Sequence, residues 1–177
     1  MRNIEIKARI DDPAVKISRV KQLTTDEGKI IKQHDTFFKI PNVTQYENTK
    51  LKLRRFEDDS GELIYYHRAN TLDPKLSTYE KTSLDLNACA GIERILSASN
   101  GCLGIVKKTR ILYMVGQTRV HIDEVEGLGN FLELEVVLTD EQDTNDGQKI
   151  AEDLMTKLDI KSEDLIANAY IDLLTDK

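Results

Sequence analysis

The run from Arg119 to Val137 constrains the fold more than any other stretch, because its alternation predicts two neighbouring antiparallel strands. Strand side chains alternate between two faces, so the second strand has one apolar face and one face that carries Glu133 and Glu135. Asp123 takes the polar face of the first strand. The connection Glu126–Asn130 is short and contains two glycines, which favours a hairpin over a long crossover. Taken alone, this hairpin is typical of a sheet with one acidic face in water.

The composition is ordinary for a globular protein. With 177 residues, 40% hydrophobic and 32% charged, the chain is predicted to form one domain, residues 1–177, with a sizeable core. No apolar run approaches the roughly 20 residues of a membrane span, and the N-terminus lacks the apolar core of a signal peptide. We therefore expect a cytoplasmic protein with no membrane partner. Cys89 and Cys102 lack metal-ligand spacing, which predicts free thiols.

The net charge of −6 argues against a general nucleic-acid binder, so no nucleic-acid partner is expected. A negative total still allows a locally basic pocket. The sequence leaves the oligomeric state open, with a homodimer as one option.

Strand-like alternation recurs along the chain and gives about eight predicted strands. Besides the two halves of the hairpin, they are expected at residues 3–10, 29–39, 49–56, 62–68, 76–84 and 103–115. Helices are expected after Asp11 or Asp12, after Asp85 or Asn87, and after Thr139 or Asp140, with a last amphipathic segment at 162–174. Eight strands are enough to close a barrel that holds one small ligand.

Basic residues pair on one face of several strands, while acids gather in the hairpin. The basic pairs are Lys7 with Arg9, Lys52 with Arg54, and Lys108 with Arg110. Like charges on neighbouring strands repel, so solvent-facing strands usually mix signs. Two interpretations stay open: the charged faces point to solvent, or they line a tunnel. A tunnel would suit a polyanion with divalent cations, because Lys and Arg hold phosphate oxygens and carboxylates hold Mg²⁺ or Mn²⁺.

Several motifs together resemble the CYTH domains, a family of triphosphate tunnel metalloenzymes that includes class IV adenylyl cyclases, thiamine triphosphatases and inorganic triphosphatases. NIEIKAR at 3–9 is similar to the family's ExExK signature, and HIDEVEGLGNFLELE at 121–135 to its late hairpin. LKLR at 51–54 and VKKTR at 106–110 resemble its phosphate-binding strands. With QHDTFF at 33–38 and AYIDLL at 169–174, the resemblance covers nearly the whole chain.

The resemblance implies an α+β fold, an eight-stranded antiparallel closed β-barrel (tunnel) with flanking helices, and a requirement for Mg²⁺ or Mn²⁺. It implies four metal ligands: Glu5, Asp123, Glu133 and Glu135. It implies six contacts to the triphosphate: Lys7, Arg9, Lys52, Arg54, Lys108 and Arg110. The expected catalytic set is Glu5, Lys7, Glu133 and Glu135. His67 and Arg68 are both candidates for a further basic contact, and the alternation there does not choose between them.

The chain departs from the signature at Asn3, which stands where the family has the first Glu of ExExK. An Asn can still coordinate through its carbonyl oxygen, so weaker metal binding is expected. His34 and His121 are expected to be structural, because the implied chemistry needs no imidazole.

The leading hypothesis is metal-dependent hydrolysis of a small-molecule triphosphate. No base-recognition feature is visible, which favours a small substrate such as tripolyphosphate. Two alternatives stay open. One is an adenylyl cyclase that converts ATP to cyclic AMP and pyrophosphate, and the other is a triphosphate-binding protein with little turnover, which Asn3 suggests.

Overall fold

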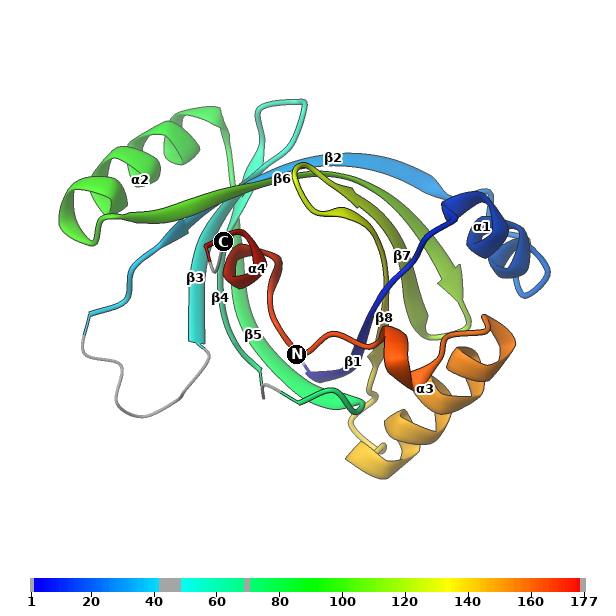
Figure 1. The fold of residues 1–177 in the computed structure, drawn as a ribbon. Coiled ribbons are helices and arrows are strands. Elements are labelled where there is room, and N and C mark those ends of the chain that lie inside the picture. Colours follow the sequence, from blue (N-terminus) through cyan, green and yellow to red (C-terminus); the bar gives the residue numbers. More distant parts are fainter. Residues whose placement is uncertain (1, 42–48, 69–70, 176–177) are drawn as a thin grey trace.

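The structure is a computed structural model that describes residues 2–41, 49–68 and 71–175. In these residues eight antiparallel strands close into a barrel in the order β1-β5-β4-β3-β2-β6-β7-β8. The strands are β1 (Arg2–Arg9), β2 (Lys29–Phe38), β3 (Thr49–Arg55), β4 (Gly61–Arg68), β5 (Lys75–Leu84), β6 (Cys102–Val115), β7 (Thr118–Val125) and β8 (Gly129–Val137). Figure 1 shows them as a ring around an open centre. The expected α+β fold with a closed antiparallel β-barrel is confirmed.

The helices lie around this ring. They are α1 (Pro13–Lys21), α2 (Leu86–Ser99), α3 (Thr144–Lys157), the single 3₁₀ turn η1 (Ser162–Asp164) and α4 (Tyr170–Thr175). In Figure 1, α1, α2 and α3 lie outside the ring, and α4 lies within its outline. None of the helices in the described ranges combines the length and the apolarity needed to cross a membrane.

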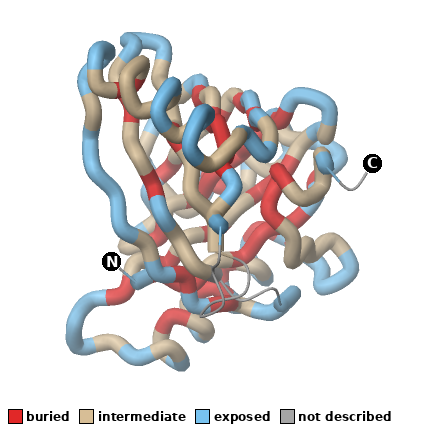
Figure 2. The backbone as a smooth tube through the Cα atoms, turned by 90° about the vertical axis from the view of Figure 1, so that its left-hand side faces the viewer, coloured by how far each residue is buried: buried red, intermediate tan, exposed pale blue. Residues whose placement is uncertain are grey.

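The largest core cluster lies outside the barrel wall, under the helices, whereas a second cluster includes Phe37, Val106 and Tyr170, which line the barrel interior. The outward faces of β1, β7 and β8 are apolar and pack with α1 and α3. Fully buried members of this core are Ile4, Ile6, Val120, Leu132, Leu134, Val136, Ala151 and Leu158. A smaller cluster of Phe38, Leu53 and Cys89 lies where α2 packs on the barrel. Figure 2 shows the buried stretches (red) mainly within the molecule and the exposed stretches (pale blue) mainly around its edges. Since the apolar faces point outward, the charged faces must point into the barrel.

Helix α3 approaches β1 closely because Gly147 has no side chain. A Cβ at Gly147 would lie 2.5 Å from Cγ1 of Ile4 and 2.6 Å from a Cδ of Leu138. Contacts this short require a shift of the backbone or of packed core atoms. The glycine therefore sets the distance between α3 and the barrel wall.

The start of α3 differs from the expectation of a cap at Thr139 or Asp140. Asp143 is the N-cap: its carboxylate accepts from the Asp146 amide at 3.0 Å, and the Asp146 carboxylate accepts from the Asp143 amide at 3.1 Å. These two hydrogen bonds satisfy the backbone N–H groups of Asp143 and Asp146 at the start of α3. Instead, the Thr139 amide donates to the side chain of Gln142 at 3.1 Å.

The last amphipathic segment, residues 162–174, divides into η1, an extended stretch and α4. The Ile166 amide donates to the Lys7 carbonyl at 2.9 Å, and Leu165 forms an isolated β-bridge with Ala8. After this contact the chain turns so that Ala169 and Tyr170 line the barrel interior. The C-terminal segment is thus anchored on β1 and brings side chains from α4 into the tunnel.

Candidate active site

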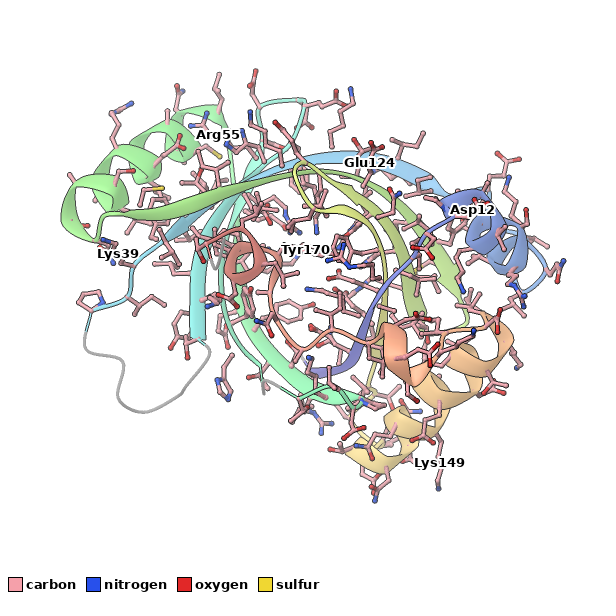
Figure 3. The ribbon with its side chains drawn as sticks, viewed as in Figure 1. Asp12, Lys39, Arg55, Glu124, Lys149 and Tyr170 are labelled. Carbon is pink, nitrogen blue, oxygen red and sulfur yellow. The ribbon has the colours of Figure 1, made fainter. Side chains whose placement is uncertain are left out.

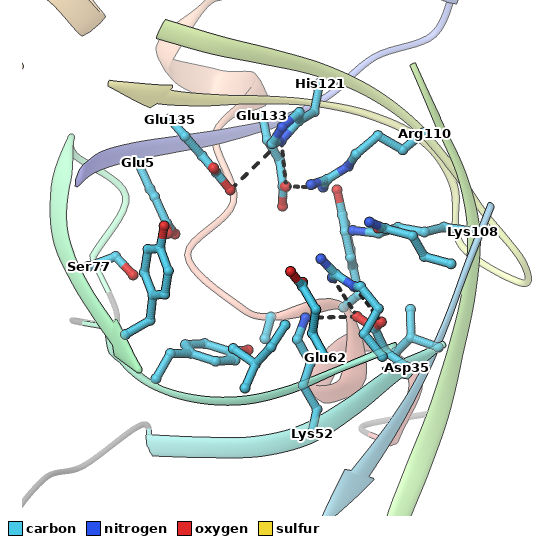
Figure 4. Close-up of a pocket in the computed structure, with 18 of the residues that line it drawn as sticks. Glu5, Asp35, Lys52, Glu62, Ser77, Lys108, Arg110, His121, Glu133 and Glu135 are labelled. Atoms are coloured by element: carbon cyan, nitrogen blue, oxygen red, sulfur yellow. Dashed lines mark hydrogen bonds and ion pairs between the residues drawn. The ribbon is translucent and has the colours of Figure 1, made fainter. Parts of the chain in front are cut away.

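The barrel encloses a cavity of about 310 Å³ that side chains from all eight strands and from α4 line. Figure 3 shows the centre of the ring filled with side chains, with Tyr170 among them, and Figure 4 shows the cavity itself. About half of the lining residues are charged: Glu5, Lys7, Asp35, Lys52, Arg54, Glu62, Lys81, Lys108, Arg110, Arg119, Glu133 and Glu135. The second of the two interpretations, charged faces that point into a tunnel, is confirmed.

Glu133 lies between two cations in this cavity. Lys7 Nζ lies 3.2 Å from Glu133 Oε1, and Arg110 Nη2 donates to Glu133 Oε2 at 2.5 Å. Strand register explains the arrangement, since Lys7 pairs with Glu133 across β1 and β8. Burial alone would raise the pKa of Glu133, but the charges of Lys7 and Arg110 hold it well below its usual range. The carboxylate is therefore ionised at neutral pH.

Asp123 is buried beneath the cavity surface. It is 0% exposed and is absent from the cavity lining, in contrast to the expectation that it binds metal directly. Arg110 donates to both of its oxygens at 2.6 Å, Lys108 donates at 3.1 Å, and the Tyr170 hydroxyl donates at 3.0 Å. Burial opposes ionisation, but Arg110 and Lys108 lower the pKa of Asp123. Asp123 thus serves as an anchor for Lys108, Arg110 and α4.

Three side chains form a group that could hold a divalent cation. Ligand atoms of His121, Glu133 and Glu135 all lie within 4.8 Å of one another. His121 Nδ1 lies 3.7 Å from Glu133 Oε2 and 3.8 Å from Glu135 Oε1. Burial and the charge of Arg110 lower the pKa of His121, which favours the neutral imidazole that binds metals. His121, expected to be structural, therefore lies among the candidate ligands.

Buried polar atoms in the cavity support the binding of a cation. Among the described residues that line it, Asn3 Oδ1, Gln33 Oε1 and His121 Nδ1 are buried without a hydrogen-bond partner. Such atoms are costly to bury unless water or an ion satisfies them. Glu5 also lines the cavity and pairs with Glu135 across β1 and β8. The compact group consists of Glu133, Glu135 and His121, and does not include Glu5; its two carboxylates fit Mg²⁺ or Mn²⁺, while Glu5 and Asn3 line the same cavity.

A second charged group, Asp35 with Lys52 and Arg54, forms another part of the wall. Arg54 donates to the two carboxylate oxygens of Asp35 at 2.8 Å each, and Lys52 donates at 2.7 Å. Lys52 and Arg54 were expected from the sequence, whereas Asp35 was not. The period-two alternation of β2 could have placed Asp35 on one face with Gln33 and Phe37, but the aromatic pair at 37 and 38 obscured that pattern.

Two predicted basic contacts, Arg9 and His67, do not line the cavity. Arg9 is exposed, donates to the Leu128 carbonyl at 2.9 Å, and lies 4.8 Å from the ring centre of Phe131. The fully buried Phe131 is its partner across β1 and β8 and takes the inward position at that level. His67 is absent from the cavity lining, and the side chain of Arg68 lies outside the described residues.

Several cavity residues were missed by the sequence analysis: Asp35, Glu62, Tyr79, Lys81, Arg119 and Tyr170. Arg119 donates to Glu135 at 2.8 Å, so it orients a candidate metal ligand. Arg119 is two residues before His121 and four before Asp123, so strand alternation puts the three on one face, and the sequence alone could have identified Arg119. By contrast, Tyr170 comes from a helix, and no strand alternation could have found it.

Comparison with known proteins gives a family match over most of the chain. The model for the CYTH domain matches residues 1–170. Two curated relatives, one of them Adenylate cyclase CyaB of Aeromonas hydrophila, are 35% identical over 71 and 65 residues. These stretches cover 38% and 37% of this chain and only 39% and 34% of the relatives.

Solved structures share the fold over nearly the full chain. A protein of Pyrococcus horikoshii superposes with a TM-score of 0.81 at 22% identity, covering 97% of this chain and 98% of the other. A Hippeastrum protein, named as an adenylyl cyclase and described as revealing a dominant triphosphatase activity, has a TM-score of 0.65 at 18% identity. That match covers 98% of this chain and 95% of the other. At these identities the likeness shows the fold alone.

Proposed function

Since the chain belongs to the CYTH domain family, we propose that it is a metal-dependent triphosphatase that hydrolyses a triphosphate substrate inside the tunnel. The substrate is inorganic tripolyphosphate or an organic or nucleoside triphosphate. One observation carries the proposal: Glu133 lies between Lys7 and Arg110, and it forms a compact group with His121 and Glu135 in the same cavity. Cations for phosphate and ligands for a divalent ion are thus side by side.

The cations of the cavity bind and orient the phosphate chain. Lys7, Lys52, Arg54, Lys108 and Arg110 all line the tunnel, and each is held by a carboxylate of the wall. Fixed N–H donors aimed at developing charge lower the barrier of phosphoryl transfer without reorganisation. Lys7, Lys108 and Arg110 are buried, so water screens their charges less and these interactions are stronger than at the surface.

The carboxylates provide the metal site. Glu5, Glu133 and Glu135 are the proposed ligands, with Asn3 and His121 as additional donors. A divalent ion held there supplies positive charge to the phosphate oxygens. Arg119 holds one oxygen of Glu135 and leaves the other directed toward His121, so the wall presents this carboxylate to the ion.

The test is product identification from tripolyphosphate, ATP and thiamine triphosphate with Mg²⁺ or Mn²⁺. We expect phosphate release that EDTA abolishes. Glu133→Gln should lower turnover by about 100-fold or more, because it removes a ligand charge and the partner of two cations. Glu124→Gln on the outer side of β7 is the matched control, since Glu124 is exposed (Figure 3) and its loss should not alter turnover. Unchanged turnover in Glu133→Gln would contradict the assignment.

An adenylyl cyclase is the second candidate, and one observation favours it: a curated relative bears that name. The aromatic rings of Tyr66 and Tyr79 line the cavity and offer surfaces on which a nucleobase can stack. Cyclic AMP and pyrophosphate from ATP, in place of phosphate, would favour this candidate over the hydrolase. Binding of tripolyphosphate with no product from any substrate would instead favour a triphosphate-binding protein.

A further inference from the structure

Asp35 faces the cavity, yet the proposed hydrolysis gives it no task. It projects from β2 and is 2% exposed. Its two partners, Lys52 and Arg54, both come from β3, where a period of two puts them on the same face. Three hydrogen bonds of 2.7 to 2.8 Å join them to the single carboxylate. Figure 4 shows Asp35 and Lys52 side by side in the wall of the cavity.

Asp35 is unsuited to proton transfer. Burial alone would raise the pKa of Asp35, but the charges of Arg54 and Lys52 bring it well below its usual range. A carboxylate that stays ionised and accepts hydrogen bonds from two cations is a weak general base. Its contacts instead fix the positions of its partners, because Arg54 donates through Nε and Nη2 in the bidentate geometry.

The surroundings of Lys52 show why a carboxylate is needed here. Burial and the neighbouring charge of Arg54, with a further effect of Lys108, lower the pKa of Lys52 to about 7, whereas Asp35 acts to raise it. The rings of Phe37 and Tyr66 flank the Lys52 ammonium at 5.4 and 5.6 Å. On the neighbouring strand β4, Glu62 also lines the cavity and bonds to Lys81. Asp35 is the carboxylate that contacts Lys52 directly.

We propose that Asp35 is a positioning residue that holds Lys52 and Arg54 together as a fork for the phosphate groups of the substrate. The proposal rests on the proposed function, since the fork requires a phosphate ligand. Asp35 takes one of the three N–H groups of the Lys52 ammonium and two of the five of the Arg54 guanidinium. The remaining donors are available to phosphate oxygens. Asp35 thereby determines the orientation of both cations and maintains the charge of Lys52.

The test uses two variants of the full chain and calorimetric binding of tripolyphosphate with Mg²⁺. Asp35→Asn keeps the shape of the side chain and removes its charge, and it should raise Kd roughly 10-fold to 100-fold. As the pH is raised, the affinity of this variant should also begin to decline at a lower pH than that of the parent, because the pKa of Lys52 falls when the carboxylate of residue 35 is removed. Asp35→Glu keeps the charge and displaces the carboxylate by one methylene. It should weaken binding while retaining the pH profile of the parent.

Glu80→Gln is the charge-matched control. It removes an exposed carboxylate of β5 that does not line the cavity and leaves the three bonds of Asp35 intact, so it should not weaken tripolyphosphate binding. An NMR titration of the Lys52 ε-carbon adds a measurement that needs no ligand. The midpoint for Lys52 should fall in Asp35→Asn and stay unchanged in Glu80→Gln.

Binding by Asp35→Asn that is equal to or tighter than that of the parent, with an unmoved Lys52 titration, would overturn the proposal. If Asp35→Asn does not fold, Asp35→Glu decides: unchanged affinity in that variant would overturn the positioning role. Failure of the proposed function looks different, because the parent protein itself would then show no binding of tripolyphosphate and no turnover, whatever the titration of Lys52 shows.

Discussion

The Tyr170 hydroxyl donates a hydrogen bond of 3.0 Å to Asp123, which ties α4 to the fully buried carboxylate that also holds Lys108 and Arg110. The C-terminal helix is thereby part of the wall that positions the cations. The ring of Tyr170 also lies 3.9 Å from Lys7 Nζ and 4.9 Å from the ring of Phe131, measured to ring centres. The end of the chain and the late hairpin therefore form one structural unit.

Tyr170→Phe should lower the free energy of unfolding by about 1 to 3 kcal/mol, because it removes one donor from a buried carboxylate and keeps the ring contacts. Urea denaturation followed by circular dichroism measures this difference. Thr175→Val, a change on the same short helix that removes a hydroxyl bonded only to backbone carbonyls of α4, is the control and should cost less. Equal stability of parent and Tyr170→Phe would mean that the bond to Asp123 contributes nothing.

Affinity for tripolyphosphate should fall as the pH rises through about 7, with Lys52 as the group responsible. Burial and Arg54 lower its pKa to about 7, so Lys52 is a cation below this pH and loses its charge above it. An anion binds the charged form better, so binding should be accompanied by proton uptake near neutral pH. Calorimetry in buffers of different ionisation enthalpy measures this uptake.

Lys52→Arg distinguishes the pH dependence that comes from the titration of Lys52 from the one that comes from ionisation of the ligand. Arginine stays charged across this range, so the variant should bind without the Lys52 component of proton uptake. A pH dependence that is the same in Lys52→Arg and in the parent would assign the effect to the ligand and contradict the prediction.

The sequence was sufficient to predict which strand faces form the barrel interior, but not how far along the tunnel each residue lies. Alternation placed Glu133 and Glu135 opposite the apolar face of β8, and the structure confirms that these faces point in and out of the barrel. Alternation does not reveal how far along the tunnel a residue lies. Arg9 and Asp123 show this, since both pair with the fully buried Phe131 of β8 and none of the three lines the cavity.

The partners of Asp35 and the start of α3 could not be predicted for a different reason. Each depends on a partner that sequence periodicity does not identify: Lys52 and Arg54 on another strand for Asp35, and the reciprocal amide bonds with Asp146 for the Asp143 cap. Several side chains near Thr139 could have capped a helix, and only the path of the chain over the barrel selects one of them.

The close approach of α3 to β1 should make Gly147→Ala destabilising by about 1 to 3 kcal/mol, because the added Cβ would clash with Ile4 and Leu138 in the core. Gly91→Ala is the matched control on α2, where a Cβ meets nothing within 4 Å. That change should stabilise the protein by up to about 1 kcal/mol through helix propensity. Thermal or urea unfolding of both variants gives the comparison, and a stabilised Gly147→Ala would show that the contact relaxes freely.

The unusual residue of the signature, Asn3, gives the sharpest test of the metal site. Its side chain is 1% exposed, lines the cavity, and leaves Oδ1 without a hydrogen-bond partner among the described residues. Asn3→Asp keeps this shape and adds a negative charge, so it should tighten Mn²⁺ binding about 10-fold relative to the parent, whereas Asn3→Ala, which lacks the oxygen, should weaken it. Calorimetric titration with Mn²⁺ in the absence of substrate measures both changes. If the three proteins bind Mn²⁺ equally, the ion lies away from β1, and the group of His121, Glu133 and Glu135 on β7 and β8 must hold it without Asn3.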